Sequence, residues 1–442
     1  MFDRFNSTIF KSLKSKVTQI DVLEHVIYYL TLAYIVLVPL NYSISRKTLY
    51  VIIVFSIIYF LISKNWKFYT EKPTLICLIF FIITVLSLIN VPSSLLGQAG
   101  NGIRKTFIYI VFFLVTVDLL RTEKRLWYLI YCLLITCTIT SIDALIQYNL
   151  GYSILNHEGL FINAEYNDAL LGIYRVTSNF GHPDSISVLL GGFVFIFMSL
   201  GFFYLEGFRG LFFKVVTTIC LFALFLTFSR GVAFAMIVAG VLFILLKRSV
   251  GVVIYSILIV SVMLLILPKG VKTWIVDAKS FSDLYVGVQT KHMKYQRSGR
   301  LEQWQAALNM IKAHPFTGVG IHTFSYRFDQ YKLPHDTKTK MGPHNLYLAI
   351  ASEMGIFALL ITLLGLILLF FACIKTFYKP RNREIQIISL GLMCSLTFFI
   401  LFGIYGSSVF LGTWRLGPTL WLPLVLVVAV YRLNFRTKTI SS

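Results

Sequence analysis

The chain has 442 residues, of which 57% are hydrophobic, and its mean hydropathy is +0.77. This composition excludes an ordinary soluble domain, because runs of about 20 apolar residues, enough to cross a bilayer core, recur along the chain. The net charge of +21 would suggest nucleic acid in a soluble protein, but there is no basic run with interleaved aromatic residues, so we expect no nucleic-acid partner. The runs are continuously apolar rather than alternating, which predicts an all-α polytopic membrane protein and not a β-barrel.

Twelve segments are apolar enough to be transmembrane helices. They lie near residues 22–40, 48–63, 73–90, 106–120, 126–147, 185–205, 211–228, 232–246, 250–267, 345–374, 384–404 and 416–432. The first segment lacks a small-residue cleavage site, so we expect an uncleaved helix rather than a signal peptide. All six cysteines fall inside these segments, which predicts neither a disulfide framework nor a zinc site, and we expect no metal or other cofactor.

The distribution of Lys and Arg predicts how these helices are oriented. With the N-terminus inside, the predicted cytoplasmic segments hold 21 of the 40 basic residues, whereas the outer segments apart from one large loop hold seven. By the positive-inside rule, this bias puts both termini in the cytoplasm. The chain then divides into nine helices over residues 1–267, with a smaller outer loop at 148–184, a large outer loop at 268–344, and three helices over 345–442.

The large outer loop carries twelve Lys or Arg against five Asp or Glu, and this balance beside a bilayer favours an anionic, lipid-linked substrate. Residues 300–313 are predicted to form a helix ended by His314-Pro315, and a Gly-Val-Gly turn follows at 318–320. The apolar residues of this helix recur at helical spacing, at Leu301, Trp304, Leu308 and Ile311. Such a helix could lie along the membrane surface or pack on the bundle, and the sequence leaves both open.

Four residues on the outer side could carry chemistry. His344 stands where the large loop re-enters the bilayer, and the pKa of histidine suits proton transfer near neutral pH, although a lone histidine at a helix start is often structural. Arg175, Arg230 and Arg300 lie on the side that is poor in basic residues. The planar guanidinium group matches phosphate oxygens, so the three could clamp a diphosphate, or they could be three separate solvated charges.

Three acidic residues lie in or near the predicted spans. Glu353 is predicted to lie inside the span at 345–374, and its spacing from His344 places the two on opposite helix faces, which favours a structural hydrogen bond or ion pair. Asp118 is expected to be an interfacial charge close to Arg121, and Asp143 could orient a partner.

Four segments resemble those of the O-antigen ligase and polymerase family of bacterial envelope glycosyltransferases. The first runs from Tyr174-Arg175 to His182-Pro183, and the second is Thr227-Phe-Ser-Arg230-Gly231. The third runs from Ser298-Gly-Arg300 through Trp304 to His314-Pro315 and Gly318-Val-Gly320. The fourth is Pro343-His344-Asn345-Leu-Tyr347 with Glu353-Met-Gly355. These matches cover residues 174–355 in the order and topology that the family shows.

The resemblance implies the transfer of a glycan from undecaprenyl diphosphate to an acceptor hydroxyl on the periplasmic face of the bacterial inner membrane. It implies that His344 is the base or the group that positions the acceptor, and that Arg175, Arg230 and Arg300 bind the diphosphate. Supporting roles are implied for the other motif residues, Asn345, Tyr347, Glu353, Trp304 and His314. Without a metal, fixed guanidinium groups would stabilise the charge of the leaving group, and attack opposite the diphosphate would invert the anomeric centre.

Several activities stay open within this resemblance. A ligase would transfer O-antigen to lipid A–core, a polymerase would join lipid-linked repeats, and a related branch glycosylates proteins. Many ligases carry a His-x-His pair at the fourth segment, where this chain has Gly342 before His344. The large loop and the arginine set nevertheless favour a ligase. A twelve-span transporter is the alternative from another class, but a long loop after the ninth helix and on the outer face is not typical of transporters built as two halves.

Overall fold

The computed structural model describes residues 2–63, 72–155, 167–168, 173–266, 300–334, 339–406 and 417–435, and over these ranges the chain is almost entirely helical. The α-helices in chain order are α1 (Phe2–Leu40), α2 (Tyr42–Ser63), α4 (Lys72–Leu86), α5 (Leu96–Leu119), α6 (Glu123–Leu150), α7 (Pro183–Phe203), α8 (Gly207–Phe225), α9 (Arg230–Lys247), α10 (Val250–Ile266), α13 (Arg300–Ala313), α14 (Phe324–Tyr331), α15 (Leu346–Met354), α16 (Ile356–Tyr378), α17 (Arg383–Phe402) and α19 (Leu422–Phe435). Short 3-10 helices are η1 (Ser87–Asn90), η2 (Ser93–Leu95), η4 (Ser178–Phe180) and η5 (Gly417–Trp421). Two antiparallel two-residue strands, β1 (Asn167–Asp168) and β2 (Ile173–Tyr174), pair Asn167 with Tyr174 and Asp168 with Ile173.

The predicted fold class, an all-α polytopic membrane protein, is confirmed. In the described part of the chain, nine helices are long and apolar enough to cross a membrane. The other three predicted spans coincide with α5, which is polar at its start, and with the shorter apolar helices α10 and α19.

The centre of the bundle is formed by α7 and α17, whose residues are mostly buried, whereas only 22% of the residues in the apolar windows of α4 and α16 are buried. Glycines let the two central helices approach closely. A Cβ on Gly191 of α7 would meet the ring of Phe398 at 2.2 Å, and one on Gly391 of α17 would meet the Cα of Ile196 at 2.6 Å. Packing through small residues is the usual way in which membrane helices associate, because lipid offers no hydrophobic drive to bring them together.

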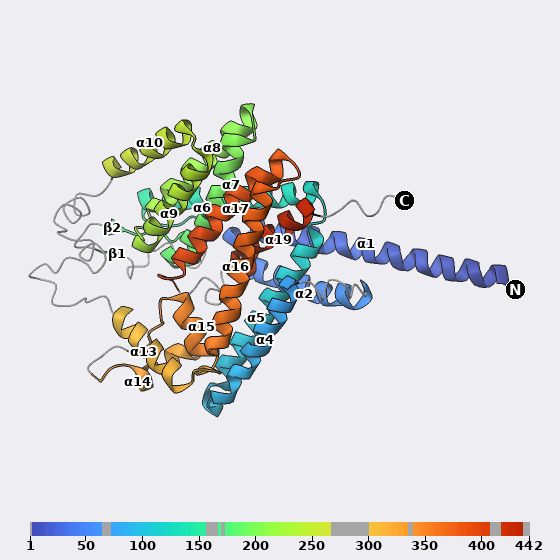
Figure 1. Cartoon of the computed structure of the whole chain (residues 1–442), viewed down its shortest axis with the longest axis horizontal. Helices are drawn as coiled ribbons and strands as arrows, with labels where there is room; N and C mark the ends of the chain where they lie inside the picture. Colours follow the sequence, from blue (N-terminus) through green and yellow to red (C-terminus); the bar gives the residue numbers. More distant parts are fainter. Residues whose placement is uncertain are drawn as a thin grey trace, which may run out of the picture.

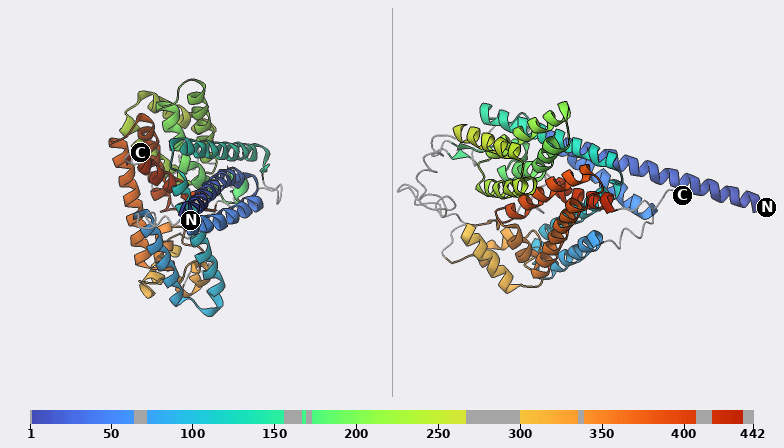
Figure 2. Two further views of the ribbon diagram at one scale, coloured as in Figure 1. Left: turned by 90° about the vertical axis from the view of Figure 1, so that its right-hand side faces the viewer. Right: turned by 45° about the horizontal axis from the view of Figure 1, so that its top comes forward.

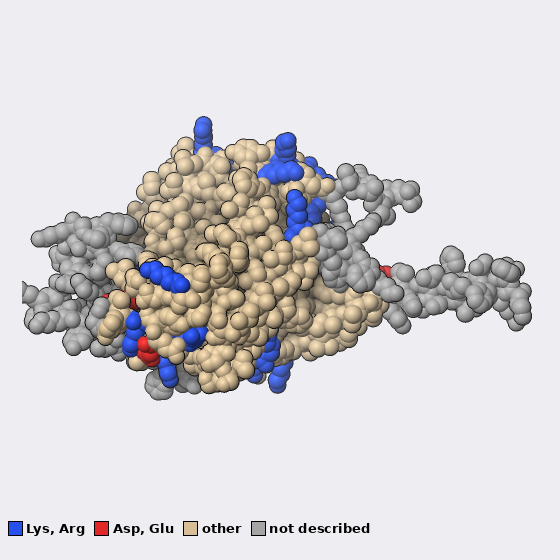
Figure 3. All heavy atoms as spheres, turned by 60° about the horizontal axis from the view of Figure 1, so that its bottom comes forward, with Lys and Arg blue, Asp and Glu red and all other residues tan. Residues whose placement is uncertain are grey.

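The helices form an elongated bundle with one long projection. Figure 1 shows α13, α14 and α15 grouped together beside one end of α4 and α5, with α8, α9 and α10 on the opposite side of the bundle. Figure 2 shows that the N-terminal part of α1 extends well beyond the other helices. On the face drawn in Figure 3, Lys and Arg side chains gather in separate groups with a wide uncharged surface between them, as expected of a surface that meets lipid.

The prediction of one continuous helix over 345–374 is wrong, because the chain breaks at Gly355 between α15 and α16. Gly355 has a φ of +85°, a conformation that glycine adopts without strain. A Cβ there would lie 2.1 Å from the carbonyl oxygen of Phe316, and the Ile356 N–H donates to the Pro315 carbonyl at 2.8 Å. The break therefore serves as the docking place of the segment that follows α13.

The described part of the large loop is a small helical unit with its own core. The predicted helix at 300–313 is confirmed as α13, and the glycine turn at 318–320 is also present, with positive φ at Gly318 and Gly320. Its core comprises Ala306, Ala307, Met310, Val319, Phe324 and Phe328. Arg327 of α14 donates to the Asn90 carbonyl at 3.0 Å, and Asn90 donates to the Gly318 carbonyl at 2.9 Å. These bonds fasten the unit to the turn between α4 and α5.

At the other end of α5, charged residues tie four helices together. The expected proximity of Asp118 to Arg121 is confirmed, since the two form an ion pair at 2.6 Å, and Tyr59 of α2 donates to the same carboxylate at 2.8 Å. Arg121 also pairs with Glu24 of α1 at 3.0 Å, and Glu24 pairs with Arg125 of α6. Each buried charge here has a partner of opposite sign, which is what makes its burial tolerable.

Candidate functional site

Two of the predicted site segments, far apart in sequence, lie side by side. The Val176 N–H donates to the Leu226 carbonyl at 3.2 Å, and the Arg175 Nε donates to the Thr227 carbonyl at 2.8 Å. Arg175 is thereby held against the turn that leads into α9, whose first helical residue is Arg230. Arg230 is exposed, and Thr227 is fully buried. The structure thus brings the Arg175 and Arg230 segments together.

The N-termini of α7 and α9 meet at a histidine–carboxylate pair. His182 is the N-cap of α7, and its Nδ1 accepts a hydrogen bond from the Asp184 N–H at 3.0 Å. The Asp184 carboxylate accepts a hydrogen bond from Ser229, the N-cap of α9, at 3.3 Å, and lies 3.9 Å from His182. Pro183 at the first helical position and an acid in the first turn are both favourable at a helix N-terminus. The pair therefore has a structural reason to lie where it does.

His344 lies within electrostatic reach of this pair and of Arg300. Burial lowers the pKa of His344 below its usual value, and the positive charge of Arg300 and the imidazole of His182 lower it further, whereas the carboxylate of Asp184 acts in the opposite direction. Burial also lowers the pKa of His182, with Asp184 opposing and Arg175 adding to that effect. Both imidazoles are therefore neutral near pH 7, and a neutral imidazole can accept a proton.

The backbone around His344 is fixed by contacts to α17. The Leu346 N–H donates to the Gly403 carbonyl at 2.7 Å, and the Tyr347 hydroxyl donates to the Ile400 carbonyl at 2.7 Å. Asn345 is the N-cap of α15, and its side chain accepts a hydrogen bond from the Leu348 N–H at 3.0 Å. The predicted supporting residues Asn345 and Tyr347 thus hold the start of α15, directly after His344.

Three segments of the site each contain a residue in the left-handed region. Ser178, Phe228 and His344 have φ values of 48°, 46° and 43°. None is glycine, so each conformation is strained and persists only where its surroundings enforce it. Such strain is concentrated at functional sites, and here it accompanies the segments that carry Arg175, Arg230 and the loop histidine.

Two polar residues of α6 hold the strained turn at Ser178. Asp143 accepts from the Ser178 hydroxyl at 2.6 Å, and Gln147 accepts from the backbone N–H groups of Thr177 and Ser178 at 2.8 Å each. Asp143 and Gln147 lie one helical turn apart, so they present their side chains on one face of α6. Asp143 thus orients the backbone turn at Ser178. From the sequence we expect only that this residue could orient a partner, without naming one.

The first turn of α13 carries Arg300 and Trp304. Both side chains are partly buried, and the indole N–H of Trp304 lies in the interior without a hydrogen-bond partner, as do one oxygen of Glu302 and one of Gln303. Buried polar atoms are normally satisfied, so three unpartnered atoms in one helical turn are unusual. They come from the same turn as Arg300, whose charge acts on His344.

Two predicted site residues lie elsewhere. Glu353 accepts hydrogen bonds from the backbone N–H groups of His322 at 2.9 Å and Phe324 at 3.1 Å, so it anchors the loop unit to α15. His314 lies 3.1 Å from the hydroxyl of Tyr331, and burial and the nearby Arg327 lower its pKa. His322 contacts Lys105 at 3.5 Å, and burial and this lysine lower its pKa to about 4. None of these contacts involves His344.

Sequence reasoning missed Asp184, Ser229 and Gln147. The His-Pro-Asp order at 182–184 carries a readable signal, because it combines an N-cap, a proline at the first helical position and an acid in the first turn. That signal predicts a helix start and not a site. The proximity of Ser229 to Asp184 depends on how α7 packs against α9, and no local pattern contains it.

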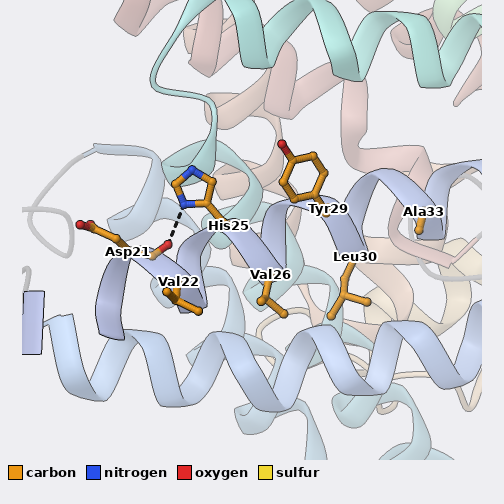
Figure 4. Close-up of a pocket in the computed structure, with 7 residues that line it drawn as sticks. All are labelled: Asp21, Val22, His25, Val26, Tyr29, Leu30 and Ala33. Carbon is orange, nitrogen blue, oxygen red and sulfur yellow. Dashed lines mark hydrogen bonds between the residues drawn. The ribbon is translucent and has the colours of Figure 1, made fainter. Parts of the chain in front are cut away.

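A separate hollow lies on α1. Figure 4 shows its lining along one side of that helix, with the ring of His25 bonded to the Asp21 carbonyl at 2.7 Å. Its residues are Asp21, Val22, His25, Val26, Tyr29, Leu30 and Ala33. None of these residues lies in the segments that carry the predicted arginines and His344. The lining is mainly the apolar surface of α1, which includes a candidate membrane span.

Arg175 lies within electrostatic reach of His182, and Arg300 lies within electrostatic reach of His344. A cation beside a neutral imidazole is suited to binding an anion and accepting a proton. Among the described residues, no group of three or more His, Cys, Asp or Glu side chains could hold a metal ion.

Comparison with known protein families matches residues 215–363 to the family described as O-Antigen ligase. The matched segment contains Arg230, Arg300 and His344, and it begins after Arg175 and His182. No curated protein matches the chain.

Proposed function

Because the chain belongs to the O-antigen ligase family, and so to glycosyltransferases of the ligase and polymerase type, we propose that it transfers a glycan from undecaprenyl diphosphate to a hydroxyl of lipid A–core. The reaction takes place on the periplasmic face of the bacterial inner membrane, with both termini of the chain in the cytoplasm. Membrane lipid surrounds the enzyme, and the donor and acceptor reach the site from the bilayer.

The proposed chemistry assigns one role to each side of the site. Arg175, Arg230 and Arg300 bind the diphosphate, whose negative charge grows as the bond between the anomeric carbon and the phosphate oxygen breaks. His344 takes the proton of the acceptor hydroxyl while that oxygen forms the new bond to the anomeric carbon. Attack opposite the leaving diphosphate inverts the anomeric centre. The proposal thus assigns one group to each charge that develops.

The observation that carries this proposal is the electrostatic coupling of His344 to Arg300 and His182. His344 belongs to the re-entry after the large loop, Arg300 to α13, and His182 to the start of α7. A base must be unprotonated at working pH, and burial together with Arg300 favours the neutral imidazole. A histidine with only a capping role would need no such surroundings.

The test is transfer by the purified enzyme from a lipid-linked glycan to lipid A–core. We expect His344→Ala to abolish transfer while the donor still binds, because the arginines remain. His25→Ala is the matched control, since His25 is exposed on α1, where its ring bonds to the Asp21 carbonyl. A well-folded His344→Ala enzyme with full activity would contradict the proposed role.

Polymerisation of lipid-linked repeats is the alternative, and Gly342 in place of the first histidine of a His-x-His pair favours it. Lipopolysaccharide from a host that lacks the gene separates the two activities. Core without a ladder, together with long lipid-linked chains, identifies a ligase. Core that carries a single repeat identifies a polymerase, and an unchanged ladder points to another glycan, to protein glycosylation or to transport.

A further inference from the structure

The helix α13 packs on the bundle through one face and leaves an apolar face uncovered. Its buried side chains are Gln303, Ala306, Ala307 and Met310. These are small or flexible residues, which allow α13 to lie close against α14 and α15. Leu301 and Leu308 are instead 66% and 42% exposed. They are seven residues apart, so they lie on the same side of the helix.

The uncovered apolar face of α13 is connected through Phe316 to the exposed surface of α16, which is a candidate membrane span. Phe316, three residues after α13 ends, is 63% exposed, and its ring stacks on Phe357 with centroids 5.8 Å apart and planes inclined by 21°. Phe357 is the second residue of α16, is itself 52% exposed, and begins a row of exposed apolar side chains that continues through Leu360 and Leu364. The Phe316–Phe357 stack therefore joins the loop unit to the lipid-facing side of α16.

Lipid explains this arrangement better than water does. Leaving large apolar side chains in water forgoes about 25 cal/mol for each Å² that could be buried. The two basic side chains of α13 are placed for an interface, because Lys312 is exposed in the last turn and Arg300 is partly exposed in the first. Long basic side chains can keep their stems in an apolar layer and extend their charge to the phospholipid headgroups.

We propose that α13 lies in the headgroup region of the outer leaflet, with Leu301, Leu308 and Phe316 inserted among the upper acyl carbons. The partner is the phospholipid bilayer itself, and the surface that contacts it continues that of α16. This placement goes beyond the proposed function and does not depend on it. If that function also holds, Arg300 lies at the depth where a diphosphate on a polyprenyl chain must lie.

The test measures the depth of position 308 in a bilayer. Leu308→Cys is labelled with an environment-sensitive fluorophore in a parent chain that carries Cys77→Ala and Cys132→Ala, because the other four cysteines are buried. The protein is placed in nanodiscs of phosphatidylethanolamine and phosphatidylglycerol. Asp329→Cys on the exposed side of α14 is the aqueous control, and Leu364→Cys on α16 is the control within the membrane.

We expect the probe at 308 to be quenched at least twofold more by lipids spin-labelled near the headgroup than the probe at 329. A water-soluble quencher should show the reverse order. Equal quenching at 308 and 329 would place α13 in water and overturn the proposal. Protection of 308 from both quenchers would mean that protein or a second copy covers this face, which overturns it too. Adding His344→Ala to the labelled chain should leave the depth unchanged, so this result does not depend on catalysis.

Discussion

The carboxylate of Asp143 accepts a hydrogen bond of 2.6 Å from the hydroxyl of Ser178, a residue whose backbone is held in the left-handed region at a φ of 48°. The same carboxylate accepts hydrogen bonds from the Ser153 hydroxyl at 2.8 Å and from the backbone N–H groups of Ile154 and Leu155 at 2.8 and 3.2 Å. One buried acid of α6 thus organises both the end of its own helix and the start of the segment that runs from Arg175 to His182.

Asp143→Ala should weaken donor binding more than it slows the chemical step. Loss of the carboxylate leaves four donors without a partner, at about 1–3 kcal/mol for each one that stays buried, and the segment that carries Arg175 relaxes. The measurement is the KM for the lipid-linked donor alongside kcat, at a temperature where the variant is folded. Asp21→Ala on the exposed side of α1 is the control. An unchanged donor KM in a folded Asp143→Ala enzyme would show that the segment needs no such support.

The rate of transfer should fall when the pH is lowered through the pKa of His344, which lies below the usual histidine value. The base must be neutral, and the pKa of His344 is lowered by burial and by Arg300, so activity is full near pH 7 and is lost as pH falls through that lowered pKa. Removing the positive neighbour in Arg300→Gln should raise this pKa and move the acid limb of kcat/KM to higher pH. Removing the negative neighbour in Asp184→Asn should move it to lower pH.

The control for these shifts is Lys312→Gln, which removes a cation from the exposed last turn of α13. It should leave the midpoint of the acid limb unchanged, because Lys312 is not among the charges that act on His344. If Arg300→Gln and Lys312→Gln shift the limb equally, the effect comes from net charge and not from the neighbourhood of His344.

The membrane architecture could be predicted from the sequence because span length and apolarity are local properties. Each of the twelve predicted spans overlaps at least one α-helix, and α13 has the predicted bounds. The helix predicted over 345–374 failed because Gly355 lies within an apolar run and its break is imposed by Phe316 and Pro315, about 40 residues earlier. Hydropathy carries no information about such a contact.

The candidate site was predictable only in part, for the same reason. Arg175, Arg230, Arg300 and His344 stand out as charged or titratable residues at helix ends, which a sequence displays. Asp184 and Gln147 gain their roles from how α7 meets α9 and how α6 meets the turn at Ser178. The apolar spacing of Leu301 and Leu308 was read correctly as one face, but only the structure shows that the opposite side packs on the bundle.

Gly318→Ala should destabilise the protein strongly, whereas Gly100→Ala should not. Gly318 has a φ of +68°, and a Cβ there would lie 2.3 Å from the backbone carbon of Glu353. The left-handed conformation alone costs alanine about 1–2 kcal/mol, and the backbone clash adds to it. Gly100 lies in α5 with nothing within 4 Å of a new Cβ, so alanine there should be neutral or stabilising by up to about 1 kcal/mol. Thermal midpoints in detergent compare the two.

Arg230→Lys should impair donor binding although the charge is kept. An ammonium group lacks the planar fork that engages two phosphate oxygens at once. We expect a several-fold rise in donor KM with little change in stability, because the side chain is exposed at the first turn of α9. Lys247→Arg at the other end of α9 is the comparison, and it should leave the donor KM unchanged. Normal donor affinity in Arg230→Lys would remove Arg230 from the diphosphate site.

Glu353→Gln should loosen the loop unit without removing a catalytic group. Both carboxylate oxygens accept backbone N–H groups, from His322 and Phe324, and an amide presents only one oxygen and places its NH₂ against the second donor. Hydrogen exchange at these two amides should therefore accelerate, and the thermal midpoint should fall. Activity per folded molecule should decline only because loosening of the loop unit displaces Arg300. The donor KM should therefore rise, and the pH profile should keep its shape. A changed acid limb in Glu353→Gln would mean that this carboxylate takes part in proton transfer, and the anchoring role would then be insufficient.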